Sequence, residues 1–181
     1  MSRLIRFLAA AALLVLSSTQ LQATHAYGGE ITWKCFTTGP NAGKVRFYMR
    51  VYRDCGSGFN DPGPNVNLVS TVPGVSSIAM TQTNQNTLGG TDVSPTCYLI
   101  PSPINCGGVP AGQGGIQEKL YESNSFYNLT GVPPATGWIF SFTVINRPTI
   151  LTNIPGSSNL VLRAVMYPYS INGTPQNMST C

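Results

Sequence analysis

The chain has 181 residues, and only 9% of them are charged, with ten lysines and arginines against six acidic residues. Because these few basic residues are spread along the chain, the composition argues against a nucleic-acid-binding protein. The 19 glycines and 14 prolines, together with many Asn, Ser and Thr residues, are instead typical of a loop-rich extracellular β-domain.

The first 23 residues have the pattern of a cleavable secretory signal. Arg3 and Arg6 form the charged start, an apolar run over 7–16 follows, and Leu-Gln-Ala at 21–23 gives a cleavage site. The apolar run is shorter than the roughly 18 residues that span a bilayer, so cleavage is preferred to an uncleaved anchor, and no transmembrane segment is expected afterwards. The mature chain would begin near Thr24 and keep 181 − 23 = 158 residues, enough for one domain, 24–181.

Two segments of alternating apolar and polar residues open the mature chain, and each ends in a cysteine. In the first, Ile31, Trp33 and Cys35 share one face. One face of the second is apolar: Val45, Phe47, Met49 and Val51. The other face is basic and aromatic: Arg46, Tyr48, Arg50 and Tyr52. The turn residues at 38–43 predict a hairpin, and a turn centred on residues 40 to 42 would place Cys35 opposite Phe47.

Six further strands are predicted where apolar alternation is bounded by Gly, Pro or Asn: 66–71, 76–81, 97–100, 116–121, 138–145 and 160–167. The strand at Trp138 should line the core, since Phe140, Phe142 and Val144 share its face. No helical periodicity appears. The pattern predicts an all-β, antiparallel immunoglobulin-like sandwich in preference to a closed barrel. The polar stretches 56–64 and 81–94 are predicted surface loops, where a binding surface would be carried.

Five cysteines in an exported chain predict disulfides: Cys35, Cys55, Cys97, Cys106 and Cys181. The firmest predicted pair is Cys97 with Cys106, which would close a short proline-containing loop. In the hairpin described above, Cys55 would lie near Tyr27, far along the ladder from Cys35. Cys181 is therefore a candidate partner for one of them, and the odd count leaves one thiol over. The chain has no CxxC spacing and a single histidine, His25, which argues against a zinc site.

No catalytic constellation emerges, and the chain is predicted to be neither an enzyme nor a cofactor-binding protein. His25 precedes the first strand and is interpreted as an exposed terminal residue. Glu118 and Glu122 share one face of a strand about 13 Å apart, and they are interpreted as its solvent face. Asp54, Asn60 and Asp61 are weak calcium candidates, because oxygen ligands from Gly- and Pro-rich loops suit this ion. The interpretation of these three as ordinary turn residues is preferred.

Tyr48 and Tyr52, with Arg50 between them, form the one candidate platform for a ligand in the sequence. Exposed aromatic side chains of this kind would mark a carbohydrate-binding module, which is the alternative function. The preferred interpretation makes them half-buried strand residues.

Four blocks of sequence carry a resemblance: THAYGGEITWKC at 24–35, GKVRFYMRVYRDC at 43–55, PTCYLIPSPINC at 95–106 and VPPATGWIFSF at 132–142. They resemble the N-terminal domain of large secreted surface proteins of Bacteroidota, which carry further modules and a gliding-motility-associated, type IX secretion sorting domain. The resemblance covers essentially all of the mature chain. It implies a non-catalytic, adhesin-like module, secreted or held at the outer cell surface. Its expected partners are downstream modules of the same chain and an extracellular glycan or surface protein.

Two departures from that family limit what can be transferred. Many relatives have a paired Cys-Cys in the strand that here spans 140–147, where this chain has none. Their disulfide pattern therefore cannot be imposed on Cys35 and Cys55. The sequence also ends at Cys181 without a sorting domain, so the chain is expected to be the first module of a longer, truncated protein.

Overall fold

The computed structural model describes residues 26–55, 62–87, 89–95, 106, 115–144 and 159–175. These residues form β-strands joined by turns and contain no helix, which confirms the all-β prediction. Nothing in them could cross a membrane as a helix. The predicted signal at 1–23 and the predicted strand at 97–100 lie outside the described residues.

The strands are β1 (Ala26–Phe36), β2 (Lys44–Asp54), β3 (Asn65–Val72), β4 (Val75–Gln82), β5 (Thr91–Asp92), β6 (Ile116–Ser123), β7 (Trp138–Val144), β8 (Leu160–Met166), β9 (Ser170–Ile171) and β10 (Thr174–Pro175). Strands β3, β4, β6, β7 and β8 begin within one residue of their predicted starts. The alternation of apolar and polar residues identified each of them, because one face of every strand packs into the interior.

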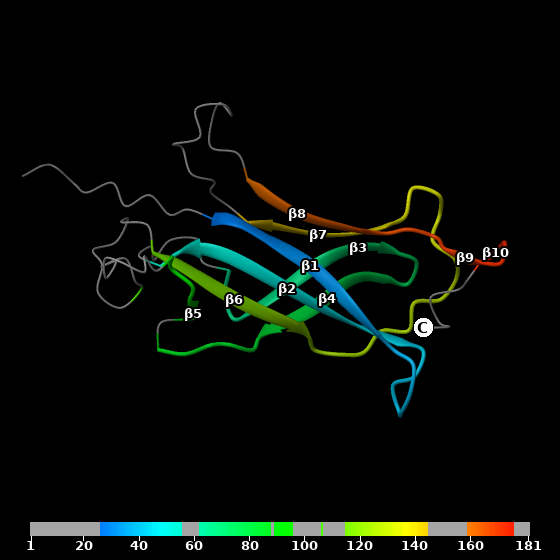
Figure 1. Cartoon of the computed structure of the whole chain (residues 1–181), viewed down its shortest axis with the longest axis horizontal. Coiled ribbons are helices and arrows are strands. Elements are labelled where there is room, and N and C mark those ends of the chain that lie inside the picture. Colours follow the sequence, from blue (N-terminus) through cyan, green and yellow to red (C-terminus); the bar gives the residue numbers. More distant parts are fainter. Residues whose placement is uncertain are drawn as a thin grey trace, which may run out of the picture.

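Eight of these strands form one antiparallel sheet in the order β1-β2-β6-β4-β3-β7-β8, with β5 paired to β6. In Figure 1, β7 and β8 lie along one side of the molecule and β6 along the other, with β1 and β2 between them. The two runs β1-β2-β6-β4 and β3-β7-β8 have the order of the two sheets of an immunoglobulin constant-type sandwich. Here the β3–β4 hairpin joins the two runs into one ladder. The immunoglobulin-like classification stays a prediction, to which this strand order adds support.

The two ends of the sheet meet, because β8 lies beside β1. Gly29 on β1 makes this approach possible: a Cβ atom built on it would lie 2.7 Å from Leu162 Cδ1 on β8 and would also clash with the carbonyl oxygen of Arg50. Only glycine, which has no side chain, allows two strands to approach so closely. We call this contact the β1–β8 seam.

The core lies between the two runs of strands and contains the faces that the alternation predicted. Val45, Phe47, Met49 and Val51 of β2 are buried. The predicted core face of β7 is also confirmed, since Trp138, Phe140 and Val144 are buried and Phe142 packs against them. The Phe140 ring centroid lies 4.6 Å from that of Phe47 and 6.0 Å from that of Trp33. One aromatic cluster therefore ties β1, β2 and β7 together.

The β1–β2 hairpin forms as predicted, but its register differs from the expected one by two residues. Cys35 is paired with Val45, and Phe47 faces Trp33 instead. The turn is closed by a 2.7 Å hydrogen bond from the Gly43 amide to the Phe36 carbonyl. Because the shift is even, every side chain keeps its predicted face.

The segment at 81–94 was predicted to be a surface loop, but both of its ends continue the sheet along β6. The Thr83 amide donates to the Leu120 carbonyl of β6. Two residues away along β6, Glu118 and then Gln117 pair with β5. Between them, the Asn84 side chain takes the place of a strand: its Oδ1 accepts from the Leu120 amide at 2.9 Å and its Nδ2 donates to the Glu118 carbonyl at 2.8 Å. Of the predicted loop at 56–64, residues 56–61 lie outside the described residues.

Residues 62 and 63 are held against the inner face of β6 by two of its side chains. Lys119 Nζ donates to the Pro62 carbonyl at 3.1 Å, and Tyr121 Oη donates to the Pro62 and Gly63 carbonyls at 3.0 and 3.2 Å. Both side chains are buried. Buried polar groups are stable when they are hydrogen-bonded, so these bonds account for a lysine in the interior.

Candidate functional site

The outer face of β1, β2 and β6 carries a lattice of opposite charges. Arg50 on β2 lies between two carboxylates, with Nη1 at 3.4 Å from Glu30 on β1 and Nε at 3.8 Å from Glu118 on β6. One end of the lattice is closed by Arg46, whose Nη2 lies 2.9 Å from Glu122. Glu118 and Glu122 therefore share the outer face of their strand, as predicted, and each is balanced by an arginine.

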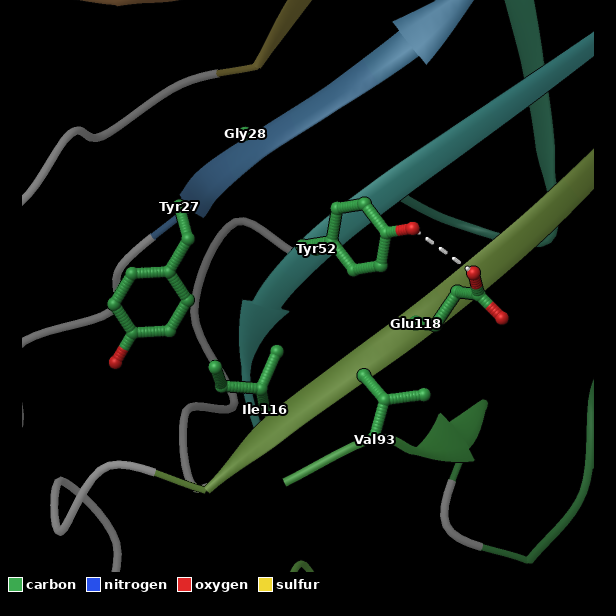
Figure 2. Close-up of a pocket in the computed structure, with 6 residues that line it drawn as sticks. All are labelled: Tyr27, Gly28, Tyr52, Val93, Ile116 and Glu118. Atoms are coloured by element: carbon green, nitrogen blue, oxygen red, sulfur yellow. Dashed lines mark hydrogen bonds between the residues drawn. The ribbon is translucent and has the colours of Figure 1, made fainter. Parts of the chain in front are cut away.

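A pocket of about 420 Å³ opens at the other end of this face. It is lined by Tyr27, Gly28, Tyr52, Val93, Ile116 and Glu118, and we call it the Tyr27–Tyr52 pocket. Figure 2 shows the Tyr27 ring on one side and Tyr52 with Glu118 on the other, with Ile116 and Val93 along the wall that joins them. The lining thus combines aromatic rings, aliphatic groups and one carboxylate from three strands, β1, β2 and β6, and from the residue after β5.

Tyr27 reaches the pocket because the β1–β2 ladder is irregular at this point. The register shifts between Ala26, which pairs with Arg53, and Gly28, which pairs with Tyr52, so Tyr27 is the extra residue of a β-bulge. Its side chain is 46% exposed. Partial burial, and secondarily the negative charge of Asp54, raise the pKa of the Tyr27 hydroxyl above its ordinary value. The ring is therefore neutral at physiological pH.

Gly28 and Gly29 face opposite sides of β1 and have different roles. Gly29 points inward at the β1–β8 seam. Gly28 points outward, and a Cβ atom built on it would meet no other atom within 4 Å. The space above Gly28 is therefore part of the pocket, and the absent side chain leaves one side of Tyr52 open.

Glu118 supplies the charged group of the pocket, and its geometry is fixed. Tyr52 Oη donates a 3.2 Å hydrogen bond to Glu118 Oε1, and Arg50 approaches the same oxygen. No side chain or amide of the described residues donates a hydrogen bond to Glu118 Oε2. The carboxylate is thus oriented through one oxygen and presents the other as an acceptor.

A disulfide and an aspartate anchor the wall of the pocket. Cys55, directly after β2, is bonded to Cys106, and the Cys106 amide donates to Asp92 Oδ2 at 2.7 Å. Asp92 Oδ1 also accepts from the amide and hydroxyl of Ser94. The hydrogen bonds from Ser94 and Cys106 outweigh partial burial and lower the Asp92 pKa. This cluster holds Val93 against β6.

The predicted pairing of Cys97 with Cys106 is therefore wrong, because Cys106 is bonded to Cys55. Pairing of β2 with β6 brings Asp54 opposite Ile116. Cys55 and Cys106, which are 51 residues apart in the sequence, therefore meet at the end of these strands. Cys35 is also disulfide-bonded, and its partner lies outside the described residues. Cys97 and Cys181 lie outside them as well.

The predicted platform of Tyr48 and Tyr52 lies on the outer face, as the alternation indicated, and both side chains are half-buried. Tyr52 lines the pocket, whereas Tyr48 is not among the lining residues. Sequence reasoning missed Tyr27, Gly28 and Val93. The one signal that could have found them is the Gly-Gly pair inside a strand, which often marks a bulge or a close backbone approach.

The calcium interpretation stays a prediction, because two of its three residues lie outside the described part of the chain. Asp54 is buried at the end of β2, and Asn60 and Asp61 lie outside the described residues. No group of three or more acidic, histidine or cysteine side chains that could hold a metal occurs among the residues described.

A second hollow, of about 540 Å³, is formed by residues of the segment 130–139 with Thr71 of β3 and Pro73 of the β3–β4 turn. The described residues that line it contribute aliphatic groups, threonine hydroxyls and backbone atoms. The buried Trp138 is the one aromatic residue among them. Because none of the described residues that line it is charged, they offer fewer ways to orient a polar ligand than the Tyr27–Tyr52 pocket does.

Comparison of the chain with family models, with curated proteins and with solved structures gave no match.

Proposed function

We propose that this chain is a non-catalytic module of a secreted or cell-surface protein and has a structural and adhesive role. The observation that carries the proposal is the disulfide between Cys55 and Cys106. Disulfides persist in oxidising compartments outside the cytoplasm. This agrees with the signal pattern at 1–23 and with the resemblance to the leading domain of Bacteroidota surface proteins.

The architecture suits a module that presents surfaces to its surroundings. Strands β1, β2, β6 and β7 share one aromatic and aliphatic core, so the outer faces are held on a rigid support. Rigid elements lower the entropic cost of binding, since little has to be ordered when a partner docks. The charged lattice and the Tyr27–Tyr52 pocket both lie on such a face, and they are where we place the adhesive surface.

Surface location can be tested in cells that express the whole chain with an epitope tag introduced in the β1–β2 turn, which is exposed at Gly39. We expect intact cells to bind the antibody, and N-terminal sequencing of the released or surface protein to start near Thr24. A variant without residues 2–23 is the control and should stay inside the cell. Protein that keeps residues 1–23 and is found only in the cytoplasm with reduced cysteines would refute the proposal.

Adhesion can be tested separately with a deletion strain. Cells that lack the protein should attach less to polysaccharide-coated or protein-coated surfaces than complemented cells do. Equal attachment by both strains, with the protein present at the surface of the complemented one, would leave the module a structural role only and contradict the adhesive part.

A further inference from the structure

We infer that the Tyr27–Tyr52 pocket is a binding site for a single neutral sugar ring. The inference deepens the proposed function, because it gives the adhesive module a ligand class and a location for it. It concerns the purified protein, so its failure can be distinguished from a failure of the proposed surface location.

The apolar part of the lining matches one side of a pyranose. Such a ring has a face of C–H groups that packs on aromatic and aliphatic surfaces, while its hydroxyls point outward around the edge. The Tyr27 ring is 46% exposed and Val93 is 39% exposed, and both line the pocket together with Ile116. Such exposed groups lose contact with water when a ring covers them, which favours binding.

The polar part of the lining favours a ligand whose hydroxyl groups donate hydrogen bonds. Glu118 Oε1 is engaged by Tyr52 and Arg50, whereas its Oε2 is oriented by the same contacts and accepts no hydrogen bond from the described residues. A sugar hydroxyl can donate to this oxygen in a charge-assisted hydrogen bond. The acceptor is fixed before the ligand arrives, as specific sites require.

The charges around the pocket favour a neutral ligand. The negative charge of Glu118 is balanced by Arg50 at 3.8 Å, so a cation would have to compete with an arginine that is already in place. An anion would meet the carboxylates of Glu118 and, beyond Arg50, Glu30. Either ion would bring an unmatched charge into the site, whereas a polyol brings none.

The pocket is large enough to hold one sugar ring. Its volume of about 420 Å³ lies at the low end of the range for small-molecule sites. Gly28 is essential to this volume, because its missing side chain leaves the space next to Tyr52 open. The Cys55–Cys106 disulfide and the Asp92 cluster hold the opposite wall in position.

The test begins with a glycan array of neutral and charged oligosaccharides on the purified mature chain, followed by calorimetry with the methyl glycoside of the strongest neutral hit. The decisive variant is Gly28→Leu, which extends into the pocket from a position where a Cβ atom would meet no other atom within 4 Å. Thr32→Leu is its matched control, because Thr32 is exposed on the same face of β1. We expect the Gly28 variant to bind at least about tenfold more weakly, and the control to bind as the wild type does.

Two further variants address the chemistry of the site. Tyr27→Ala removes an exposed ring and should also weaken binding by about tenfold, whereas Tyr27→Phe should keep it. Glu118→Gln should weaken binding because it removes the charge from the acceptor. If Gly28→Leu fails to fold, as judged by circular dichroism, Tyr27→Ala decides, since its side chain lies at the surface.

Three results would overturn the inference. The first is the absence of any neutral saccharide that binds with a dissociation constant of about 1 mM or tighter. The second is unchanged binding by a folded Gly28→Leu variant. The third is loss of binding in Tyr48→Ala together with full binding in Gly28→Leu, which would move the site to the platform of Tyr48 and Tyr52.

Discussion

The outer faces of the two runs of strands differ sharply in charge, although both cover the same core. The face on β1, β2 and β6 carries charged side chains on all three strands, among them Glu30, Lys34, Arg46, Arg50, Glu118 and Glu122. The face on β3, β7 and β8 carries small polar and β-branched side chains around one charge: Asn67, Val69, Ser141, Thr143, Val161 and Arg163. Folding requires only the inner sides of these strands, so it does not explain the difference.

Exposed ion pairs contribute little to stability, about 0 to 1 kcal/mol each, and the β3-β7-β8 face is built without them. The lattice on the other face fixes Arg50 and Glu118 in position beside a pocket. The two faces thus share one support, and the charged one is the face on which we propose that a ligand binds. Substitutions in the core, at the disulfide and on the charged face can test this difference between the two faces.

Removal of the shared core should affect both faces at once. Phe140 is fully buried and packs on Phe47 and Trp33, so Phe140→Ala should lower the free energy of unfolding by about 3–5 kcal/mol. Urea denaturation followed by tryptophan fluorescence measures this loss. Val69→Ala, at a side chain that is 62% exposed, is the control and should change it by less than about 0.5 kcal/mol. A loss below about 1 kcal/mol for Phe140→Ala would contradict the shared core.

Removal of the Cys55–Cys106 disulfide should separate the two faces. The double variant Cys55→Ser, Cys106→Ser should lose about 2–4 kcal/mol of stability. Hydrogen exchange should accelerate first in β5 and β6, which the bond anchors, and later in β7 and β8. Non-reducing peptide mapping of the wild type checks the premise. A peptide that links Cys97 to Cys106 would contradict the structure.

Alanine at the two adjacent glycines of β1 should distinguish the inside of the sheet from its charged outer face. Gly29→Ala should cost about 1–3 kcal/mol, because its Cβ would overlap Leu162 at the β1–β8 seam. Gly28→Ala should change stability by less than about 0.5 kcal/mol, since its Cβ would enter the open pocket. Thermal unfolding of the two variants makes the comparison, and the reverse order of stability would show that the bulge is misplaced.

The smallest effect should come from Asp92, which holds the pocket wall. Its pKa is lowered from the ordinary value of 3.8, first by the Ser94 hydroxyl and then by the amides of Cys106 and Ser94. A lowered pKa means that the ionised form stabilises the fold above the unfolded value of 3.8, and that this contribution is lost as the pH falls through the folded value.

Between about pH 5 and pH 2.5, wild-type stability should therefore fall more than that of Asp92→Asn, by less than about 1 kcal/mol because Asp92 is exposed. Urea midpoints at the two pH values measure the difference. Parallel pH profiles for the two proteins would show that the carboxylate does not anchor the wall. The β3-β7-β8 face should be insensitive to this substitution.

Much of the fold could be predicted from the sequence because the core strands have one buried face. The alternation in β2 and β7 identified the residues that pack inside, with Phe47 and Phe140 at the centre. Strand β5 could not be predicted, because two residues carry no periodicity and Thr91 and Asp92 are held by pairing to β6. The hairpin register depended on one hydrogen bond at Gly43, which composition does not specify.

The candidate site was less accessible to prediction, because its residues come together only through the fold. Tyr52 was identified from its strand face, but Tyr27 lies on the opposite side of a bulge that changes the alternation. Val93 and Ile116 meet through the pairing of β5 with β6. Cys106 was assigned to its nearest cysteine in sequence, whereas the pairing of β2 with β6 brings it to Cys55.

The Asn84 side chain closes a gap in the hydrogen bonding of β6, where β4 has ended and β5 has not yet begun. Without it, β6 would have a short unpaired edge at the Leu120 amide, next to the charged face. Such an edge can serve as a template for the addition of a strand from a second molecule, which is how many β-proteins begin to aggregate. The Asn84 side chain thus occupies a hydrogen-bonding position on β6 that the backbone leaves open, and we expect its removal to favour self-association.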